Sequence, residues 1–226
     1  AGLQDKCSET SNLSIRVGSR THERLIQPTL LEPKVPYATG QKWYTEKIKD
    51  TSFRVASPSF FQVNTAQAEL MIDLVVDNFD LTGKETVVDA YAGVGTFAVE
   101  VAKKAKKVIA IEESLSAVND SSYSLDSLEN VEFKLGKTED VLPTLECEVD
   151  AVIIDPPRVG CHPDALNSII NLHPSKIAYV SCDPVTLARD LDILVIGGYQ
   201  VTKVEPIDMF PQTHHIECVA TLRAKD

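Results

Sequence analysis

Residues 87–96 read Val87-Val88-Asp89-Ala90-Tyr91-Ala92-Gly93-Val94-Gly95-Thr96, and this pattern decides the fold class of the chain. A short apolar strand runs into a turn with two glycines, and the residues from 96 to 103 have the composition of a helix. Glycine at positions 93 and 95 lets the backbone pass close beneath a ligand where no side chain would fit. Position 98 is Ala, which dinucleotide-binding turns also tolerate. The glycine spacing alone therefore leaves the cofactor open, with a tight structural turn as the alternative.

Strands and helices alternate along the chain beyond residue 65. Such alternation predicts a parallel sheet with right-handed crossovers. The last two strands follow each other without a helix, so we expect a terminal antiparallel hairpin. The expected fold is α/β and Rossmann-like, with a mostly parallel seven-stranded sheet. Apolar periodicity places strands at 86–90, 108–111, 131–135, 149–154, 177–181, 199–207 and 216–223, and helices at 66–79, 96–103, 115–128, 163–171 and 184–196.

Residues 1–56 differ from the rest of the chain. They hold a polar start, a strand expected at 13–17 and a proline-interrupted stretch at 28–36. This small β-rich segment is too thin for a core of its own, and we interpret it as part of a domain whose other half is missing. Residues 57–226 form the second expected domain.

The composition is that of an ordinary globular protein, with 43% hydrophobic and 24% charged residues among 226. No apolar run approaches the length of a membrane span, and the start lacks a signal pattern. We therefore expect a cytoplasmic, monomeric protein without membrane contact. The cysteines lack CxxC spacing, which argues against a disulfide framework and against a metal site within this chain. They are Cys7, Cys147, Cys161, Cys182 and Cys218.

Carboxylates follow the second and fourth expected strands of this sheet. Glu112 ends the second strand, a position suited to gripping ribose hydroxyl groups in nicotinamide and adenosylmethionine enzymes alike. Asp155 leaves the fourth strand, and Pro156 and Pro157 stiffen the loop behind it. A hydride-transfer enzyme has no need of a rigid acidic loop there, whereas a methyltransferase has to fix a planar base. Together, Glu112 and the loop that begins with Asp155 favour a methyltransferase. The alternatives are that Glu112 is a solvated residue and that the loop has a purely structural role.

Cys182 is the candidate nucleophile, because it ends the fifth expected strand just before a helix. A helix N-terminus lowers the pKa of a thiol and favours its nucleophilic form. Carbon 5 of uracil becomes enolate-like once a thiolate adds to carbon 6. Such chemistry needs a cysteine, a proton acceptor and a methyl sulfonium within reach. A buried filler cysteine is the alternative.

Glu217 is the candidate base, at the start of the last strand in His214-His215-Ile216-Glu217-Cys218. A lone glutamate at a strand start is usually solvated. The adjacent histidines suggest a metal, but no third ligand lies at a convincing spacing, so we expect none.

Two aromatic residues, Phe60 and Phe61, precede the first long helix and are followed by Gln62 and Asn64. Aromatic rings and amides suit the stacking and edge recognition of a flipped base, or packing on the cofactor. A hydrophobic staple with a polar helix cap is the alternative, and the two interpretations are compatible.

Together these residues resemble the RNA uracil-5 methyltransferase family, class I enzymes that use S-adenosylmethionine to make 5-methyluridine in rRNA and tRNA. The resemblance covers residues 50–226 and keeps the order of the family's motifs. Cytosine-methylating relatives carry a cysteine in the loop after the fourth strand, where this chain reads Asp-Pro-Pro-Arg, which supports uracil. The matching segments are 60–64, 89–96, Glu112, 155–158, 181–184 and 215–217.

The resemblance implies an S-adenosylmethionine-dependent RNA (uracil-5-)-methyltransferase acting on rRNA or tRNA. It makes Cys182 the nucleophile that forms a covalent adduct with carbon 6 and Glu217 the base that removes the carbon-5 proton. The implied cofactor contacts are Gln62, Tyr91, Gly93, Gly95, Thr96, Glu112 and Asp155, and the implied contacts with the target base are Phe60, Asp155 and Arg158.

The net charge of -11 opposes an RNA substrate, because phosphate binding draws on clustered Lys and Arg. The chain also shows neither the RNA-binding barrel nor the iron–sulfur cysteines of many family members. Two alternatives follow: a methyltransferase of the same fold for a small molecule or protein, and a non-catalytic cofactor-binding fragment.

Overall fold

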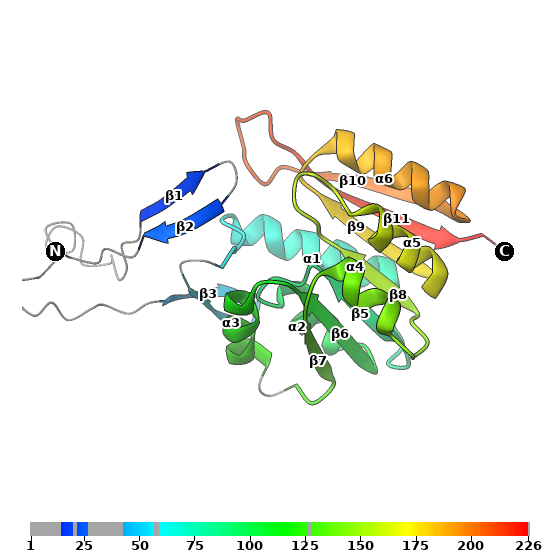
Figure 1. Ribbon diagram of the computed structural model, residues 1–226, viewed down its shortest axis with the longest axis horizontal. Helices are drawn as coiled ribbons and strands as arrows, with labels where there is room; N and C mark the ends of the chain where they lie inside the picture. The colour runs from blue at the N-terminus through cyan, green and yellow to red at the C-terminus, as the bar shows by residue number, and fades with distance from the viewer. Residues whose placement is uncertain (1–14, 20–21, 27–42, 57–58, 126–127, 226) are drawn as a thin grey trace, which may run out of the picture.

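The computed structural model describes residues 15–19, 22–26, 43–56, 59–125 and 128–225. Its centre is a seven-stranded sheet of order β10-β11-β9-β8-β5-β6-β7 (Figure 1). Parallel pairing joins β5 through β9, whereas β11 is antiparallel to both β9 and β10. The mostly parallel sheet and its terminal antiparallel hairpin are confirmed. The strands are β5 (Thr86–Ala90), β6 (Lys107–Glu112), β7 (Val131–Leu135), β8 (Ala151–Ile154), β9 (Lys176–Ser181), β10 (Tyr199–Ile207) and β11 (Glu217–Ala224).

Helices cover both faces of this sheet. Successive residues of a strand point to opposite faces, so Val87 belongs to one buried cluster and Val88 to the other. The first cluster contains residues of α1, α2 and α3, and the second contains residues of α5 and α6. The helices are α1 (Thr65–Phe79), α2 (Thr96–Ala102), α3 (Leu115–Leu125), α4 (Thr138–Val141), α5 (Pro163–Leu172) and α6 (Pro184–Ile196), with a 3-10 turn, η1 (Leu142–Thr144).

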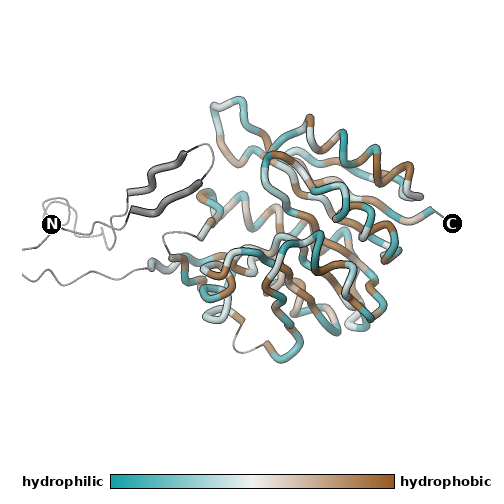
Figure 2. The backbone as a smooth tube through the Cα atoms, in the orientation of Figure 1, coloured by the Kyte–Doolittle hydropathy of each residue, from teal (hydrophilic) through white to brown (hydrophobic). Residues whose placement is uncertain are grey.

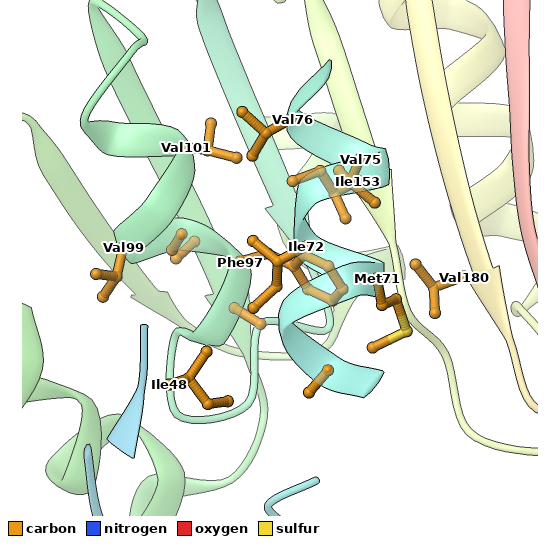
Figure 3. Packing of buried hydrophobic residues seen from close by; sticks show 14 of the residues in the cluster. Ile48, Met71, Ile72, Val75, Val76, Phe97, Val99, Val101, Ile153 and Val180 are labelled. Atoms are coloured by element: carbon orange, nitrogen blue, oxygen red, sulfur yellow. The ribbon is translucent and has the colours of Figure 1, made fainter. Parts of the chain in front are cut away.

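Helix α1 packs its apolar side between α2 and the central strands. Ile72 lies beside Phe97 of α2, and Met71 lies toward Val180 of β9 (Figure 3). The helices alternate between hydrophilic and hydrophobic residues along their length, as Figure 2 shows for α1 and α6. Leu70 is 47% exposed, because the buried face of α1 runs through Met71, Ile72 and Val75.

The segment before α1 contains two antiparallel hairpins, one of β1 (Ile15–Ser19) with β2 (His22–Ile26) and one of β3 (Trp43–Ile48) with β4 (Thr51–Ala56). The second hairpin is part of the main core, since Ile48, Phe53 and Val55 are buried in the first cluster. The expected strand at 13–17 begins outside the described residues, and the stretch 28–36 lies entirely outside them. The boundary between residues 56 and 57 stays a prediction.

The ends of some elements differ from their expected bounds. The strand expected at 149–154 begins at Ala151, and α3 ends at Leu125 rather than at 128. Sequence periodicity also missed the short helix α4 and the strands β3 and β4. Strand β3 shows why: its residues alternate weakly, with Trp43, Tyr44 and Thr45 all at least partly exposed.

Candidate active site

A cavity of about 760 Å³ opens at the carboxyl ends of the parallel strands. In open α/β sheets this edge is where ligands bind, because loops from several strands converge there. Every predicted site residue except Gly95 lines this one cavity. They are Phe60, Gln62, Tyr91, Gly93, Thr96, Glu112, Asp155, Arg158, Cys182 and Glu217.

The glycine turn between β5 and α2 lies under one side of the cavity. Gly93 and Gly95 have φ values of 56° and 85°, a region that glycine adopts without strain. A Cβ atom on Gly93 would meet nothing within 4 Å, whereas one on Gly95 would lie 3.2 Å from the Cδ1 atom of Leu125. Gly93 therefore leaves open space for a ligand, and Gly95 allows the turn to pack on α3.

Glu112 holds this turn from the neighbouring strand. One carboxylate oxygen of Glu112 accepts a hydrogen bond of 2.8 Å from the backbone N–H of Gly93, and the other accepts one of 2.7 Å from Ser114. Each carboxylate oxygen keeps a further lone pair for a ligand hydroxyl group. Glu112 is thus fixed in the position that suits a ribose.

Acidic side chains dominate the lining of the cavity. A lining of this sign attracts a cationic ligand and repels the pyrophosphate of a dinucleotide. The acidic members are Glu112, Glu113, Glu139, Asp155 and Glu217, and the basic ones are Lys137 and Arg158.

Cys182 lies between β9 and α6 and is partly exposed to the cavity. The expectation of a lowered thiol pKa is wrong. Burial and the nearby Glu217 carboxylate raise the pKa of Cys182, and Arg158 opposes this shift. The N-terminus of α6 is taken by Asp183, whose side chain accepts hydrogen bonds from Val185 and Thr186.

Glu217 is 7% exposed, so the solvated alternative is wrong for this residue. It is the first residue of β11, which begins one residue later than expected. Burial raises the pKa of Glu217, and Arg158 lowers it. Burial and the charge of Glu217 raise the pKa of Asp155 to about 7. The cavity thus holds two carboxyl groups that are more basic than ordinary ones.

A loop between β10 and β11 borders the cavity beside Arg158. The guanidinium group of Arg158 lies 3.4 Å from Nδ1 of His215, whose ring packs on those of His214 and Phe210. The side chain of Asn64 caps α1 by accepting from Gln67, and its amide donates to the carbonyl of Met209. Asn64 therefore fixes both the start of α1 and this loop.

The two aromatic residues before α1 have different environments. Phe60 is 67% exposed at the cavity, whereas Phe61 is buried and packs on Phe53, with ring centroids 5.5 Å apart. Phe60 is thus the ring that is free to stack on a ligand, whereas Phe61 packs in the core.

Sequence reasoning missed part of the lining. Lys137, Thr138 and Glu139 border the cavity from the start of α4. The sequence gives the same reason to expect them at the site, because they come just after β7. Glu112 and Asp155 stand at the corresponding ends of β6 and β8. Cys161 also lines the cavity, in the loop that carries Asp155, so this loop does contain a cysteine and the Asp-Pro-Pro-Arg motif does not by itself favour uracil. Burial raises the pKa of the Cys161 thiol to about 12, and this residue is 4% exposed, whereas Cys182 is partly exposed.

Two further findings concern the described residues only. No group of three or more His, Cys, Asp or Glu side chains among them is arranged to hold a metal ion. None of the helices in these ranges has the length and apolarity needed to cross a membrane. Cys147, Cys161, Cys182 and Cys218 are free thiols.

Comparison with known proteins gives matches along most of the chain. The chain is 42% identical over 196 residues to an uncharacterized RNA methyltransferase of Gloeobacter violaceus, which covers 86% of this chain and 42% of that protein. An uncharacterized RNA methyltransferase of Oceanobacillus iheyensis is 40% identical over 201 residues, covering 87% of this chain and 44% of the relative. The chain therefore spans less than half the length of these relatives.

Solved structures agree with the fold. The tRNA (uracil-54, C5)-methyltransferase of Pyrococcus abyssi, solved in complex with S-adenosyl-L-homocysteine, has a TM-score of 0.70 at 31% identity and covers 84% of this chain and 48% of its own. An rRNA methylase of Streptococcus thermophilus has a TM-score of 0.57 at 20% identity, covering 70% of this chain and 96% of its own, and shows the fold alone.

The sequence model described as tRNA (uracil-5-)-methyltransferase matches residues 41–145 and 141–225. These two matches cover both the glycine turn with Glu112 and the strand ends with Asp155, Cys182 and Glu217. The chain therefore belongs to the tRNA (uracil-5-)-methyltransferase family.

Proposed function

We propose that this chain carries the active site of an enzyme that transfers a methyl group from S-adenosylmethionine to carbon 5 of a uridine in rRNA or tRNA. One observation carries the proposal: Cys182, Glu217 and Asp155 line the same cavity as Glu112 and the glycine turn. Family membership supports RNA as the substrate class and uracil as the base. The Pyrococcus abyssi relative, which is named for uracil-54 of tRNA, supports the same assignment.

The lining of the cavity fits S-adenosylmethionine. This cofactor carries a positive charge, and the acidic side chains around the cavity outnumber the basic ones. Glu112 is the residue that would hold the ribose, and the bare backbone at Gly93 leaves room for the rest of the cofactor. Gln62, Tyr91 and Thr96 border the same space. When bound, the cofactor supplies the methyl group.

Cys182 would attack carbon 6 of the uracil ring. Because burial and Glu217 raise its pKa, the thiol has to lose its proton as the bond from sulfur to carbon 6 forms. The carboxylate of Asp155 is close enough for its charge to act on this thiol and is placed to accept the proton, which leaves Glu217 ionised for the later step. The electron pair of the 5,6 double bond then moves toward carbon 5 and the oxygen on carbon 4.

Arg158 and Glu217 would complete the reaction. The guanidinium group of Arg158 lies at the cavity and stabilises negative charge that develops on the uracil ring. After carbon 5 is methylated, Glu217 removes its proton, the electron pair of that bond restores the 5,6 double bond, and the Cys182 thiolate leaves carbon 6 and regains its proton from Asp155. A carboxylate with a raised pKa is a stronger base, which suits Glu217 for this step.

The test is a trapping experiment with RNA that contains 5-fluorouridine. Fluorine cannot leave carbon 5 as a cation, so the methylated adduct should persist on Cys182. We expect the intact mass of the protein to increase by the RNA and one methyl group when S-adenosylmethionine is present. Short oligonucleotides are supplied at high concentration, so that weak RNA binding is sufficient for the adduct to form.

Two variants serve as controls for this experiment. Cys182→Ala should give no adduct, whereas Cys147→Ala, which removes an exposed cysteine outside the cavity, should give the normal adduct. Absence of the adduct in a protein with measured S-adenosylmethionine binding would overturn the uracil assignment. It would favour a small-molecule or protein substrate, which the net charge of -11 also suits.

A further inference from the structure

The buried side chain of Asp190 connects α6 to the loop that carries Asp155 and Arg158. Asp190 is fully buried, and its Oδ2 atom accepts a hydrogen bond of 2.8 Å from the backbone N–H of Cys161. The same oxygen accepts one of 2.5 Å from the hydroxyl group of Tyr179 in β9. Its Oδ1 atom accepts one of 2.8 Å from Nε of Arg189. Asp190 thus joins a helix, a strand and a loop.

Helix α6 holds three backbone groups of this loop in all. Besides the bond to Cys161, the carbonyl of Val159 accepts from Nη2 of Arg189 at 3.0 Å. The carbonyl of Arg158 accepts from the hydroxyl group of Thr186 at 3.2 Å. The loop also closes on itself, since the N–H of Gly160 donates to the carbonyl of Pro157.

The fit between loop and helix is close at Gly160. Its φ value is 78°, and a Cβ atom there would lie 2.6 Å from Oδ2 of Asp190 and 2.4 Å from Nη2 of Arg189. No side chain fits between the loop and α6 at this point. The loop therefore packs on the helix in one position, which is fixed by the hydrogen bonds to Thr186, Arg189 and Asp190.

The same helix begins two residues after Cys182. Cys182 precedes Asp183, the N-cap residue of α6. The hydrogen bonds that Thr186 and Arg189 donate to the loop and the one that Asp190 accepts from it therefore fix Arg158 relative to Cys182 through a single helix. Tyr91 of the glycine turn lines the same cavity as Cys161 and His162 of this loop.

We propose that Asp190 is a positioning residue of the cavity, which holds loop 155–162 on α6 and so keeps Arg158 beside Cys182 and Glu217. This inference rests on the proposed function in taking Cys182 and Glu217 as the reacting groups. Asp190 itself does not line the cavity. It acts through the loop that does.

A matched pair of tyrosines gives the test. Tyr179 and Tyr199 are both fully buried in the second cluster, and each donates a hydrogen bond from its hydroxyl group. The acceptor of Tyr179 is Asp190, whereas that of Tyr199 is the carbonyl of Pro174, before the amino end of β9 and away from the cavity. Tyr179→Phe and Tyr199→Phe therefore remove similar bonds, of which one belongs to the Asp190 network.

The readout is the pH dependence of alkylation at Cys182, followed by peptide mass spectrometry after iodoacetamide treatment. Burial, Arg158 and Asp155 all act on the pKa of this thiol, so a displaced loop should shift the pH profile of its alkylation. We expect this shift in Asp190→Asn, a smaller one in Tyr179→Phe, and none in Tyr199→Phe. Hydrogen exchange at the Cys161 amide should speed up on the order of tenfold in Asp190→Asn.

The outcomes separate the two proposals. An unchanged Cys182 profile in folded Asp190→Asn would overturn the positioning role, and if that variant does not fold, an unchanged profile in Tyr179→Phe would do so. An equal shift in Tyr199→Phe would also overturn it, by assigning the effect to general destabilisation. Failure of the wild-type chain to trap 5-fluorouridine RNA counts against the proposed chemistry instead, and the exchange measurement still tests the loop.

Discussion

Glu217 and Cys182 lie next to each other at the ends of neighbouring antiparallel strands. Cys218 of β11 pairs with Ser181 of β9, so the next step toward the cavity brings Glu217 level with Cys182. The charge of Glu217 acts on the Cys182 thiol, and both residues line the cavity. The strand register therefore sets where the proposed base lies relative to the proposed nucleophile, since Glu217 begins β11 and Cys182 directly follows the last residue of β9.

The change Glu217→Gln should separate adduct formation from product release. The amide keeps the shape of the side chain but does not remove the carbon-5 proton, so the methylated adduct should accumulate with ordinary uridine RNA. We expect turnover to fall by roughly 10²- to 10⁴-fold, the usual contribution of a general base. Intact mass spectrometry detects the adduct, and product counting gives the rate.

Glu139→Gln is the control for this change, because Glu139 lines the same cavity from α4. It should turn over without accumulating an adduct. Normal turnover in Glu217→Gln would remove Glu217 from the role of base.

The reactivity of Cys182 should follow the charges around it. Glu217 raises the pKa of this thiol and Arg158 lowers it. Glu217→Gln should therefore speed alkylation of Cys182 at pH 8, and Arg158→Ala should slow it, each by about three- to tenfold. Alkylation of the exposed Cys147 in the same samples is the internal reference. Equal rates at Cys182 in all three proteins would show that these charges do not reach the thiol.

The strand ends of the site could be predicted from the sequence, because parallel strands bring their carboxyl ends to one edge. That rule alone places Glu112, Asp155 and Cys182 around a common space. The pKa of Cys182 could not be predicted, since it depends on the burial of the thiol and on the charge of Glu217, which comes from another strand. Neither is visible in the local pattern.

Gly95 and Asp190 show a second limit of sequence reasoning. The glycine spacing predicts a turn, but which glycine faces the ligand depends on α3, whose Leu125 fills the space beside Gly95. Asp190 has the pattern of an ordinary helix residue, and its buried partners come from β9 and from the loop after β8. Contacts between distant segments carry this part of the site.

The carboxyl group of Asp155 should make the stability of the protein depend on pH. Its pKa is raised from 3.8 to about 7 in the folded state, so between these values the folded protein holds a proton that the unfolded chain has lost. The stabilising contribution of the neutral carboxyl is complete below pH 3.8 and is lost as the pH rises to about 7.

Asp155→Asn is neutral at every pH, so its free energy of unfolding should increase relative to the wild type between pH 4 and pH 7. The gain should be about 1–4 kcal/mol. Urea denaturation across this range measures it. Parallel curves for the two proteins would mean that Asp155 ionises equally in both states.

The two glycines of the turn should respond differently to alanine. In Gly95→Ala the new methyl group meets Leu125 at 3.2 Å and the backbone keeps φ near 85°, so the free energy of unfolding should fall by about 1–2 kcal/mol. Gly93→Ala adds only the cost of its φ of 56° and fills space that we assign to the ligand. It should weaken S-adenosylmethionine binding more than stability. Calorimetric binding and thermal unfolding of both variants check this, and the reverse pattern would place the ligand beside Gly95.

Glu112→Gln should weaken cofactor binding through two effects at once. Both oxygens of the carboxylate accept backbone hydrogen bonds, from Gly93 and from Ser114, and the amide group of Gln would turn a donor toward one of these N–H groups. The turn then shifts, and one acceptor for the ribose is lost. We expect the dissociation constant for S-adenosylmethionine to rise by about tenfold or more, as measured by calorimetry. Glu113→Gln changes the next residue, which lines the same cavity but does not hold the turn, and should bind almost as the wild type does. Equal losses of affinity in both variants would mean that the negative charge of the cavity governs S-adenosylmethionine binding. The hydrogen-bonded position of Glu112 would then not be decisive.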